Sequence, residues 1–341
     1  MKPASILFIV LPVLISSCSP SIYFENTRMN QVVIEVLKPA ETSVSLNIQN
    51  VLLLTGNPED NVNISVEGDI TFWDTLPGEI KDNFMINTRL ALKQILNEGP
   101  RFFVKDTADF YFNDLNQVSW NEVEKLCEET TTDGIILLDR QKILVNSDIA
   151  PEYVSDYYGE EIHGATVDIT AECNWKIFDP INRKLERRTV KINDDYYSRG
   201  SNVDEALDGL PSFDEILDRF SFLSGEKYGN MISPVWVPVT RYYYVSGNSD
   251  MKKATRHMAS GEWQKAFDIW REYTGSSKQA LAKHASFNTI LSYEIDGDLE
   301  TALMWANNTS LRFNSIEAKS YAELLAQRLE EKRMIDEQMG W

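Results

Sequence analysis

The sequence predicts an α/β domain with a mixed sheet and packed helices, followed by an all-α domain of helical repeats. Strand-like and helix-like segments alternate through the first two thirds of the chain, and one of the strand-like segments has a hydrophobic period of two. In the last third a pattern of glycine and alanine recurs after 36 residues, a spacing typical of helical-pair repeats. We therefore expect a leader over residues 1–17, a tether over 18–27, the α/β domain over 28–246 and the helical-repeat domain over 247–341.

The first half of the α/β domain alternates strand and helix. Residues 31–37 (QVVIEVL) and 48–55 (IQNVLLLT) are rich in β-branched residues and leucine, so we expect two strands, the second buried on both faces. Residues 82–97 place apolar side chains on one face of a helix that stops at Gly99-Pro100. Another strand is expected to begin at residue 102.

Two capping boxes mark the starts of further helices. In Ser119–Glu122 (SWNE) and Ser212–Glu215 (SFDE), a serine hydroxyl and a glutamate carboxylate can satisfy free amides at a helix N-terminus. The first helix is expected to turn Cys127 inward, and the short apolar segment 135–138 (IILL) that follows it is expected to form a central strand.

The clearest strand signal lies at residues 167–177, where apolar and polar residues alternate without a break. Because successive side chains of a strand point to opposite faces, we expect one buried face, which includes Cys173, and one solvated face. Residues 184–193 return as the partner of a hairpin after a turn at 179–183 (DPINR). Residues 235–245 (VWVPVTRYYYV) are expected to form an edge strand, because the proline at position 238 cannot donate to a ladder.

The tail carries the repeat. Gly261–Ala266 (GEWQKA) and Gly297–Ala302 (GDLETA) share glycine, an acidic residue, an apolar residue, two polar residues and alanine. These residues, with Tyr293, resemble the tetratricopeptide repeat (TPR), although the period is two residues longer and the tryptophan, leucine and glycine of its first helix are missing. The resemblance implies stacked helical hairpins, with a third helix near residues 322–329 as the cap. An unrelated helical bundle is the alternative.

The first residues predict a lipid-anchored, exported protein. Lys2 precedes an apolar run over 6–15, which is too short to span a bilayer, since that takes roughly 20 helical residues. The run ends in Ile15-Ser16-Ser17-Cys18, which resembles the bacterial lipobox and implies lipidation of Cys18. The alternative is an ordinary signal peptide that ends in a chance cysteine. Ser19 at the following position favours the outer membrane, and the lack of an acidic run in residues 19–26 (SPSIYFEN) favours its periplasmic face.

The whole layout is similar to a family of uncharacterised, TPR-containing lipoproteins of Bacteroidota. The residues that carry this resemblance are the lipobox, the passage over 232–244 that contains ISPVW and RYYY, and the GEWQKA segment of the tail. The α/β domain also resembles, loosely, the small sheet domains of bacterial envelope lipoproteins of the curli-secretion and Tol-periplasmic type. Neither resemblance implies an activity.

Composition and motifs argue against several classes of function. The formal net charge of -19 disfavours nucleic-acid binding. After Cys18 no hydrolase, metal-binding, dinucleotide or phosphate-binding motif occurs, so no cofactor, metal or catalytic residue is predicted. His163 ends an acidic tract that we interpret as a solvated loop rather than a metal site. Cys127 and Cys173 are interpreted as buried small hydrophobic residues, with a single disulfide as the alternative.

Two groups of residues are candidate partner-binding sites. Trp236, Tyr242, Tyr243 and Tyr244 could form a platform for a sugar or a peptide, although packing along the edge strand is the favoured interpretation. In the second repeat, the first helix could present three residues toward a groove, the usual peptide site of such stacks; they are His284, Phe287 and Leu291.

From these patterns we expect a non-enzymatic envelope lipoprotein that is tethered to the membrane by lipid and binds another envelope protein through its helical tail or sheet edge. A glycan-binding accessory protein that uses the tyrosine-rich surface is the alternative. A carboxylate-dependent hydrolase is the third possibility, because 52 acidic residues offer many pairs whose separation a sequence does not give.

Overall fold

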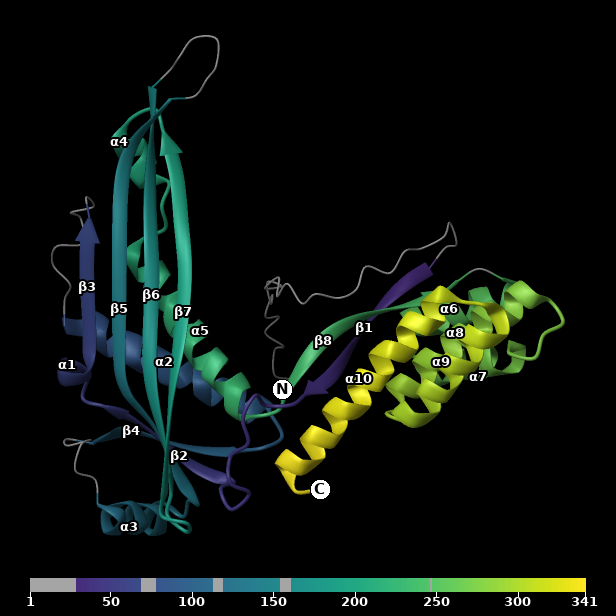
Figure 1. Cartoon of the computed structure of the whole chain (residues 1–341), viewed down its shortest axis with the longest axis horizontal. Helices are drawn as coiled ribbons and strands as arrows, with labels where there is room; N and C mark the ends of the chain where they lie inside the picture. The colour runs from purple at the N-terminus through teal and green to yellow at the C-terminus, as the bar shows by residue number, and fades with distance from the viewer. Residues whose placement is uncertain (1–28, 69–77, 113–118, 154–160, 246) are drawn as a thin grey trace, which may run out of the picture. The chain divides into compact units, whose positions relative to one another are not determined.

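The computed structural model describes residues 29–68, 78–112, 119–153, 161–245 and 247–341 (Figure 1). The predicted leader, the tether and Cys18 lie outside these residues. The chain forms two compact units. We call residues 35–239 and 330–341 the sheet unit, and the described residues of 1–34 with 240–329 the helical unit. A mixed α/β region is followed by an all-helical region, which confirms the predicted fold class.

The sheet unit is built on a six-stranded mixed sheet in the order β4-β2-β5-β6-β7, with β3 also paired to β5. Strand β2 is parallel to β4 and to β5, and β3 is parallel to β5. Strands β5, β6 and β7 are antiparallel neighbours (Figure 1). The bounds are β2 Asn50–Gly56, β3 Val62–Gly68, β4 Phe103–Phe112, β5 Gly134–Tyr153, β6 Glu161–Asp179 and β7 Lys184–Gly200.

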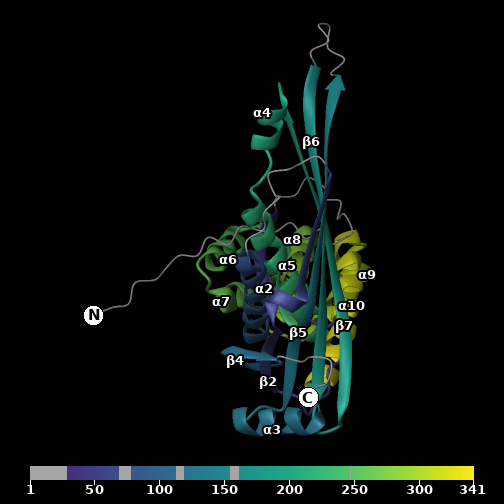
Figure 2. The same ribbon diagram turned by 90° about the vertical axis from the view of Figure 1, so that its left-hand side faces the viewer.

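Helices cover both faces of this sheet. Helices α2 (Gly78–Glu98) and α5 (Phe213–Ile232) pack on one face, which we call the inner face (Figure 2). Helix α3 (Trp120–Thr130) covers part of the opposite face, which we call the outer face. The short helices are α1 (Pro58–Asn61) and α4 (Val203–Asp208). Both predicted capping boxes are present, at the starts of α3 and α5.

The predicted alternation of β6 is confirmed. Val167, Ile169, Ala171, Cys173, Trp175 and Ile177 are each at most 2% exposed, whereas the even-numbered residues from 168 to 176 belong to the outer face. Cys127 and Cys173 are free and buried, and they belong to separate core clusters, so the disulfide alternative is wrong. His163 does not lie in a loop: it is part of β6, because the strand begins at Glu161.

The helical unit consists mainly of antiparallel helical hairpins. Its helices are α6 (Ser249–Ala259), α7 (Trp263–Tyr273), α8 (Gln279–Ile295), α9 (Leu299–Phe313) and α10 (Ile316–Met339), the last of which continues into the sheet unit. Gly261 and Gly297 have positive φ angles of 71° and 80° between the paired helices, a conformation that favours glycine. Ala266 and Ala302, at equivalent places in the repeat, are both fully buried.

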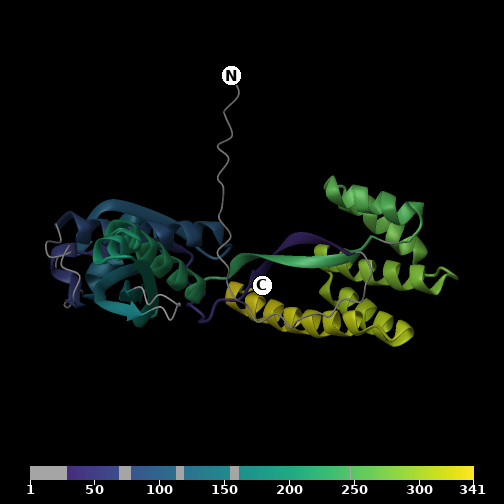
Figure 3. The ribbon, with the colours of Figure 1, turned by 90° about the horizontal axis from the view of Figure 1, so that it is seen from above.

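Among the described residues, the first and last strands pair only with each other. Strands β1 (Met29–Lys38) and β8 (Val235–Tyr244) form a separate two-stranded sheet, along which they run side by side (Figure 3). Both strands are therefore edges, which is compatible with Pro238 in β8.

The end of α10 is bound to the sheet unit by one side chain. Gln338 accepts a hydrogen bond from the backbone N–H of Ala40 and donates one to the backbone carbonyl of Ala40, each over 2.9 Å.

A close approach of α2 and α5 gives a testable expectation. A Cβ atom at Gly225 would lie 2.4 Å from the carbonyl oxygen of Thr88 and 2.7 Å from the amide nitrogen of Leu92. We expect Gly225→Ala to destabilise the sheet unit by about 1–3 kcal/mol, because the helices must move apart. Urea unfolding followed by tryptophan fluorescence measures this. Gly275→Ala, where nothing lies within 4 Å, should stay within about 0.5 kcal/mol, and equal stability of the two variants would contradict the expectation.

Candidate functional site

The end of β8 is joined to α8 by a buried amide. The side chain of Asn288 accepts a hydrogen bond from the N–H of Tyr244 over 2.7 Å and donates one to its carbonyl oxygen over 2.8 Å. Asn288 is fully buried. It therefore occupies the place of a neighbouring strand and satisfies two backbone groups that would otherwise be buried without partners.

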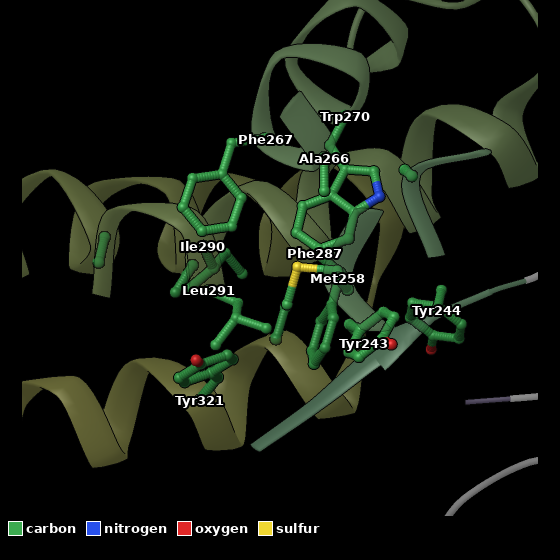
Figure 4. Packing of buried hydrophobic residues seen from close by; sticks show 14 of the residues in the cluster. Tyr243, Tyr244, Met258, Ala266, Phe267, Trp270, Phe287, Ile290, Leu291 and Tyr321 are labelled. Carbon is green, nitrogen blue, oxygen red and sulfur yellow. The ribbon is translucent and has the colours of Figure 1, made fainter. Parts of the chain in front are cut away.

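Aromatic side chains from four elements meet around this junction (Figure 4). The Tyr244 ring stacks on His284 at 4.0 Å and contacts Phe287 edge-on at 5.2 Å, and Phe287 in turn lies 5.6 Å from Tyr321 of α10. On the other side of the junction, the Tyr243 ring lies 5.7 Å from that of Trp270 in α7. Residues that the sequence assigned to two separate surfaces thus form one cluster.

Most of the predicted binding residues are inside this cluster. Leu291 is 0% exposed and Phe287 5%, because β8 and α10 cover the face of α8 that was expected to line a groove. Tyr243 and Tyr244 are also buried, as the packing interpretation expects. The remaining three are less enclosed: Tyr242 and His284 are partly buried, and Trp236 is 52% exposed. A binding role for these seven residues stays a prediction.

A buried group of charges lies beside the aromatic cluster. Glu294 of α8, whose side chain is 0% exposed, binds Arg241 of β8 through both carboxylate oxygens, each over 2.8 Å. Arg328 of α10 donates to the same carboxylate over 2.6 Å, and the Tyr321 hydroxyl donates to it over 2.5 Å. One carboxylate is thus shared by two guanidinium groups and a phenol, so its lone pairs are satisfied.

The electrostatics of this group favour the charged carboxylate. Burial raises the pKa of Glu294, but the hydrogen bonds and charge of Arg241, together with Tyr321 and Arg328, outweigh it, so the net pKa lies below the ordinary value. Burial and the neighbouring Glu294 charge raise the pKa of Tyr321. A carboxylate held in its anionic form is a poor proton donor, so this arrangement suits joining elements better than acid catalysis.

Sequence reasoning missed this charge group. The available signal was a lone carboxylate in an apolar helix, since Glu294 is the only acidic residue of α8. Nothing in the sequence pairs Glu294 with Arg241 or Arg328.

Among the described residues, no group of three or more His, Cys, Asp or Glu side chains could hold a metal ion.

We expect Glu294→Gln to destabilise the helical unit by about 3–5 kcal/mol, because it leaves two buried guanidinium groups without their counter-charge. Thermal and urea unfolding of the full chain measure the change. Glu300→Gln on the exposed start of α9 is the matched control and should change stability by less than about 0.5 kcal/mol. Equal stability of the two variants would show that the charge group contributes nothing.

The stabilisation that Glu294 provides has an expected pH dependence. Because the pKa of Glu294 is lower in the folded chain than its ordinary value of 4.5, its stabilisation is complete above that value and is lost as the pH falls through the folded pKa. Wild type should therefore lose more stability on acidification below pH 4.5 than Glu294→Gln does.

Comparisons with known proteins add a family assignment. A model described as "Domain of unknown function (DUF6340)" matches residues 252–330, within the helical region. No curated protein matches the sequence at a significant level. Solved structures with low similarity include a neuraminyllactose-binding hemagglutinin homologue from Helicobacter pylori, with 14% identity and a TM-score of 0.26 over 56% of this chain and 83% of that chain.

Two further structures are similar at the same low level. The PelC dodecamer from Paraburkholderia phytofirmans has 9% identity and a TM-score of 0.21, and covers 60% of this chain and 99% of that one. Lipoprotein GNA1162 from Neisseria meningitidis has 13% identity and a TM-score of 0.20, over 53% and 99%. Similarity this low assigns no function.

A second family model matches residues 56–244, which is more than half of the sequence. The chain therefore belongs to the family described as "Domain of unknown function (DUF8603)".

Proposed function

We propose that this chain is a lipid-anchored protein of the bacterial cell envelope that holds a protein partner through its helical unit. The observation that carries the proposal is the run Ile15-Ser16-Ser17-Cys18 at the end of an apolar segment. Each methylene of an acyl chain contributes about 0.8 kcal/mol of membrane binding, so a cysteine that carries more than one chain is stably anchored. Ser19 supports the outer membrane, and the lack of an acidic run in residues 19–26 supports its periplasmic face.

No helix among the described residues combines the length and the apolar character needed to cross a membrane.

The proposal includes a relation of this chain to the TPR-containing lipoproteins of Bacteroidota. The positive φ angles of Gly261 and Gly297 support it, as do the buried alanines five residues after each glycine. In such repeats the glycine turns the chain and the alanine allows the two helices of a pair to approach closely.

The contact with the partner is proposed to lie on α9 and at the turn into α10. Met304 and Leu311 are seven residues apart, so they lie on one side of α9, and they are 52% and 83% exposed. Ile316 at the start of α10 is 76% exposed. These side chains offer apolar area that the fold itself does not use, whereas Phe287 and Leu291 are committed to the core.

The anchor is tested by Cys18→Ser. We expect wild type to partition into the detergent phase, to sediment with envelopes and to incorporate labelled palmitate, and the variant to lose all three properties because the thiol is the site of acylation. Ser21→Ala, three residues beyond the cysteine, is the control and should behave as wild type does. Retention of Cys18→Ser in the detergent phase would contradict the proposed lipid anchor and membrane location.

The partner surface is tested by crosslinking in the native host. A photo-reactive amino acid at Leu311 should give a discrete adduct with another envelope protein, and the same group at Lys319, an exposed polar position on α10, should give little of it. Leu311→Glu should reduce capture by a reactive group at Met304, because a charge on the same apolar surface opposes burial. Equal adducts from positions 311 and 319 would rule this surface out.

A further inference from the structure

The outer face of the sheet unit carries charges in an ordered arrangement. Beyond the region that α3 covers, this face is made by alternate residues of β3, β5, β6 and β7, and no other helix described in the sheet unit packs on it. Cross-strand hydrogen bonds mark the face: Thr189 donates to Asn174 over 2.7 Å, and Thr170 donates to Asn193 over 2.9 Å. Its side chains are therefore solvated, and its composition is not set by core packing.

One end of this face is basic, and we call it the basic end. Lys142 and Lys191 flank the half-exposed Glu172 in a single cross-strand row. Arg140 and Arg187 lie on the same face toward α3, and all four cations are exposed. The ion pair of Lys176 with Asp139, at 3.0 Å, adds no net charge.

The other end is acidic, and we call it the acidic end. Its carboxylates are exposed and come from β3, β5, β6 and β7; they are Glu67, Asp148, Asp168 and Asp195. Asp168 and Asp195 lie directly opposite each other, which is unfavourable for like charges.

A neutral row separates the two ends. It consists of directly paired residues on the four strands, namely Ser65, Leu144, Thr170 and Asn193. Apart from Glu172 in the basic end and Arg199 beyond the acidic end, the charges are thus divided between two ends with an uncharged row between them.

We infer that this face binds a second copy of the same chain, face to face, with the two-fold axis along the neutral row. A rotation about that row places the basic end of each copy on the acidic end of the other, so that one surface is complementary to itself. The rotation places Lys191 of each copy over Asp195 of the other and Arg140 over Asp148, and Glu172, which lies between the two lysines, falls over Asp168. The inference does not depend on the proposed anchor or on the helical partner surface.

A second copy fits this face better than a polyanion does. A polyanion attracted to the basic end would be repelled by the acidic end of the same face and by a chain of net charge -19. Four strands about 4.8 Å apart and nine residues of about 3.3 Å give a face about 20 Å wide and 30 Å long, toward the lower end of specific interfaces. The dimer is therefore expected to be weak and salt-sensitive.

The test is crosslinking of the full chain in detergent through Thr170→Cys, because the axis places residue 170 opposite its own copy. A short bis-maleimide should yield a dimer, and the yield should fall several-fold between about 0.05 and 0.5 M salt. Lys142→Glu with Lys191→Glu should abolish the dimer, and so should Asp168→Lys with Asp195→Lys. An equal mixture of these two double variants should restore it, because each then meets the opposite charge.

Two controls keep the result specific. Lys252→Glu with Lys253→Glu changes the net charge by the same amount on exposed residues of α6 and should leave the dimer intact. A cysteine placed at Lys252 instead of Thr170 reports collisional crosslinking. The inference is overturned if the double variants crosslink as wild type does, or if mixing them does not restore the dimer. It is also overturned if the monomeric chain binds a polyanion, tested with the acidic polysaccharide polygalacturonate, through Lys142 and Lys191.

Discussion

Strand β6 has a neighbour along both of its sides, and this double pairing forces its side chains to divide between two faces. Its register with β7 is continuous, and its register with β5 shifts once, near Asp139. A slip by one residue would move Trp175 and Cys173 into solvent and Glu172 and Asn174 into the core. The alternation therefore sets the inner face, which packs under α2 and α5, and leaves the outer face polar.

In the helical unit, polar contacts rather than apolar area fix how β8 lies on α8. Tyr244 is held through its backbone by Asn288, and Arg241 is held by Glu294. A shift of β8 by one residue would break both contacts at once and leave a carboxylate and two backbone groups buried without partners. Aromatic packing around the junction tolerates small displacements much better than these bonds do, so the polar groups set the register.

The sequence predicts the parts of this fold that depend on local patterns. The capping boxes at Ser119 and Ser212 and the alternation of 167–177 each contain their whole signal within a few residues. The length of β5 and the pairing of β1 with β8 depend on partners far away in the chain, which periodicity does not identify. The predicted binding residues on α8 show the same limit, because Phe287 and Leu291 have the same spacing whether they line a groove or fill a core.

The size of the helical unit explains why its aromatic residues are buried. A small unit buries a modest fraction of its surface and needs its largest side chains inside to be stable, so Tyr244, Phe287 and Trp270 are the residues it can least leave exposed. Aromatic residues in such a unit are therefore weak indicators of a binding surface.

A solvated sheet face does not have to bury its side chains for the chain to fold. Folding requires only that its side chains be polar, and the separation of Lys142 and Lys191 from Asp168 and Asp195 is consequently more informative about association than any buried cluster.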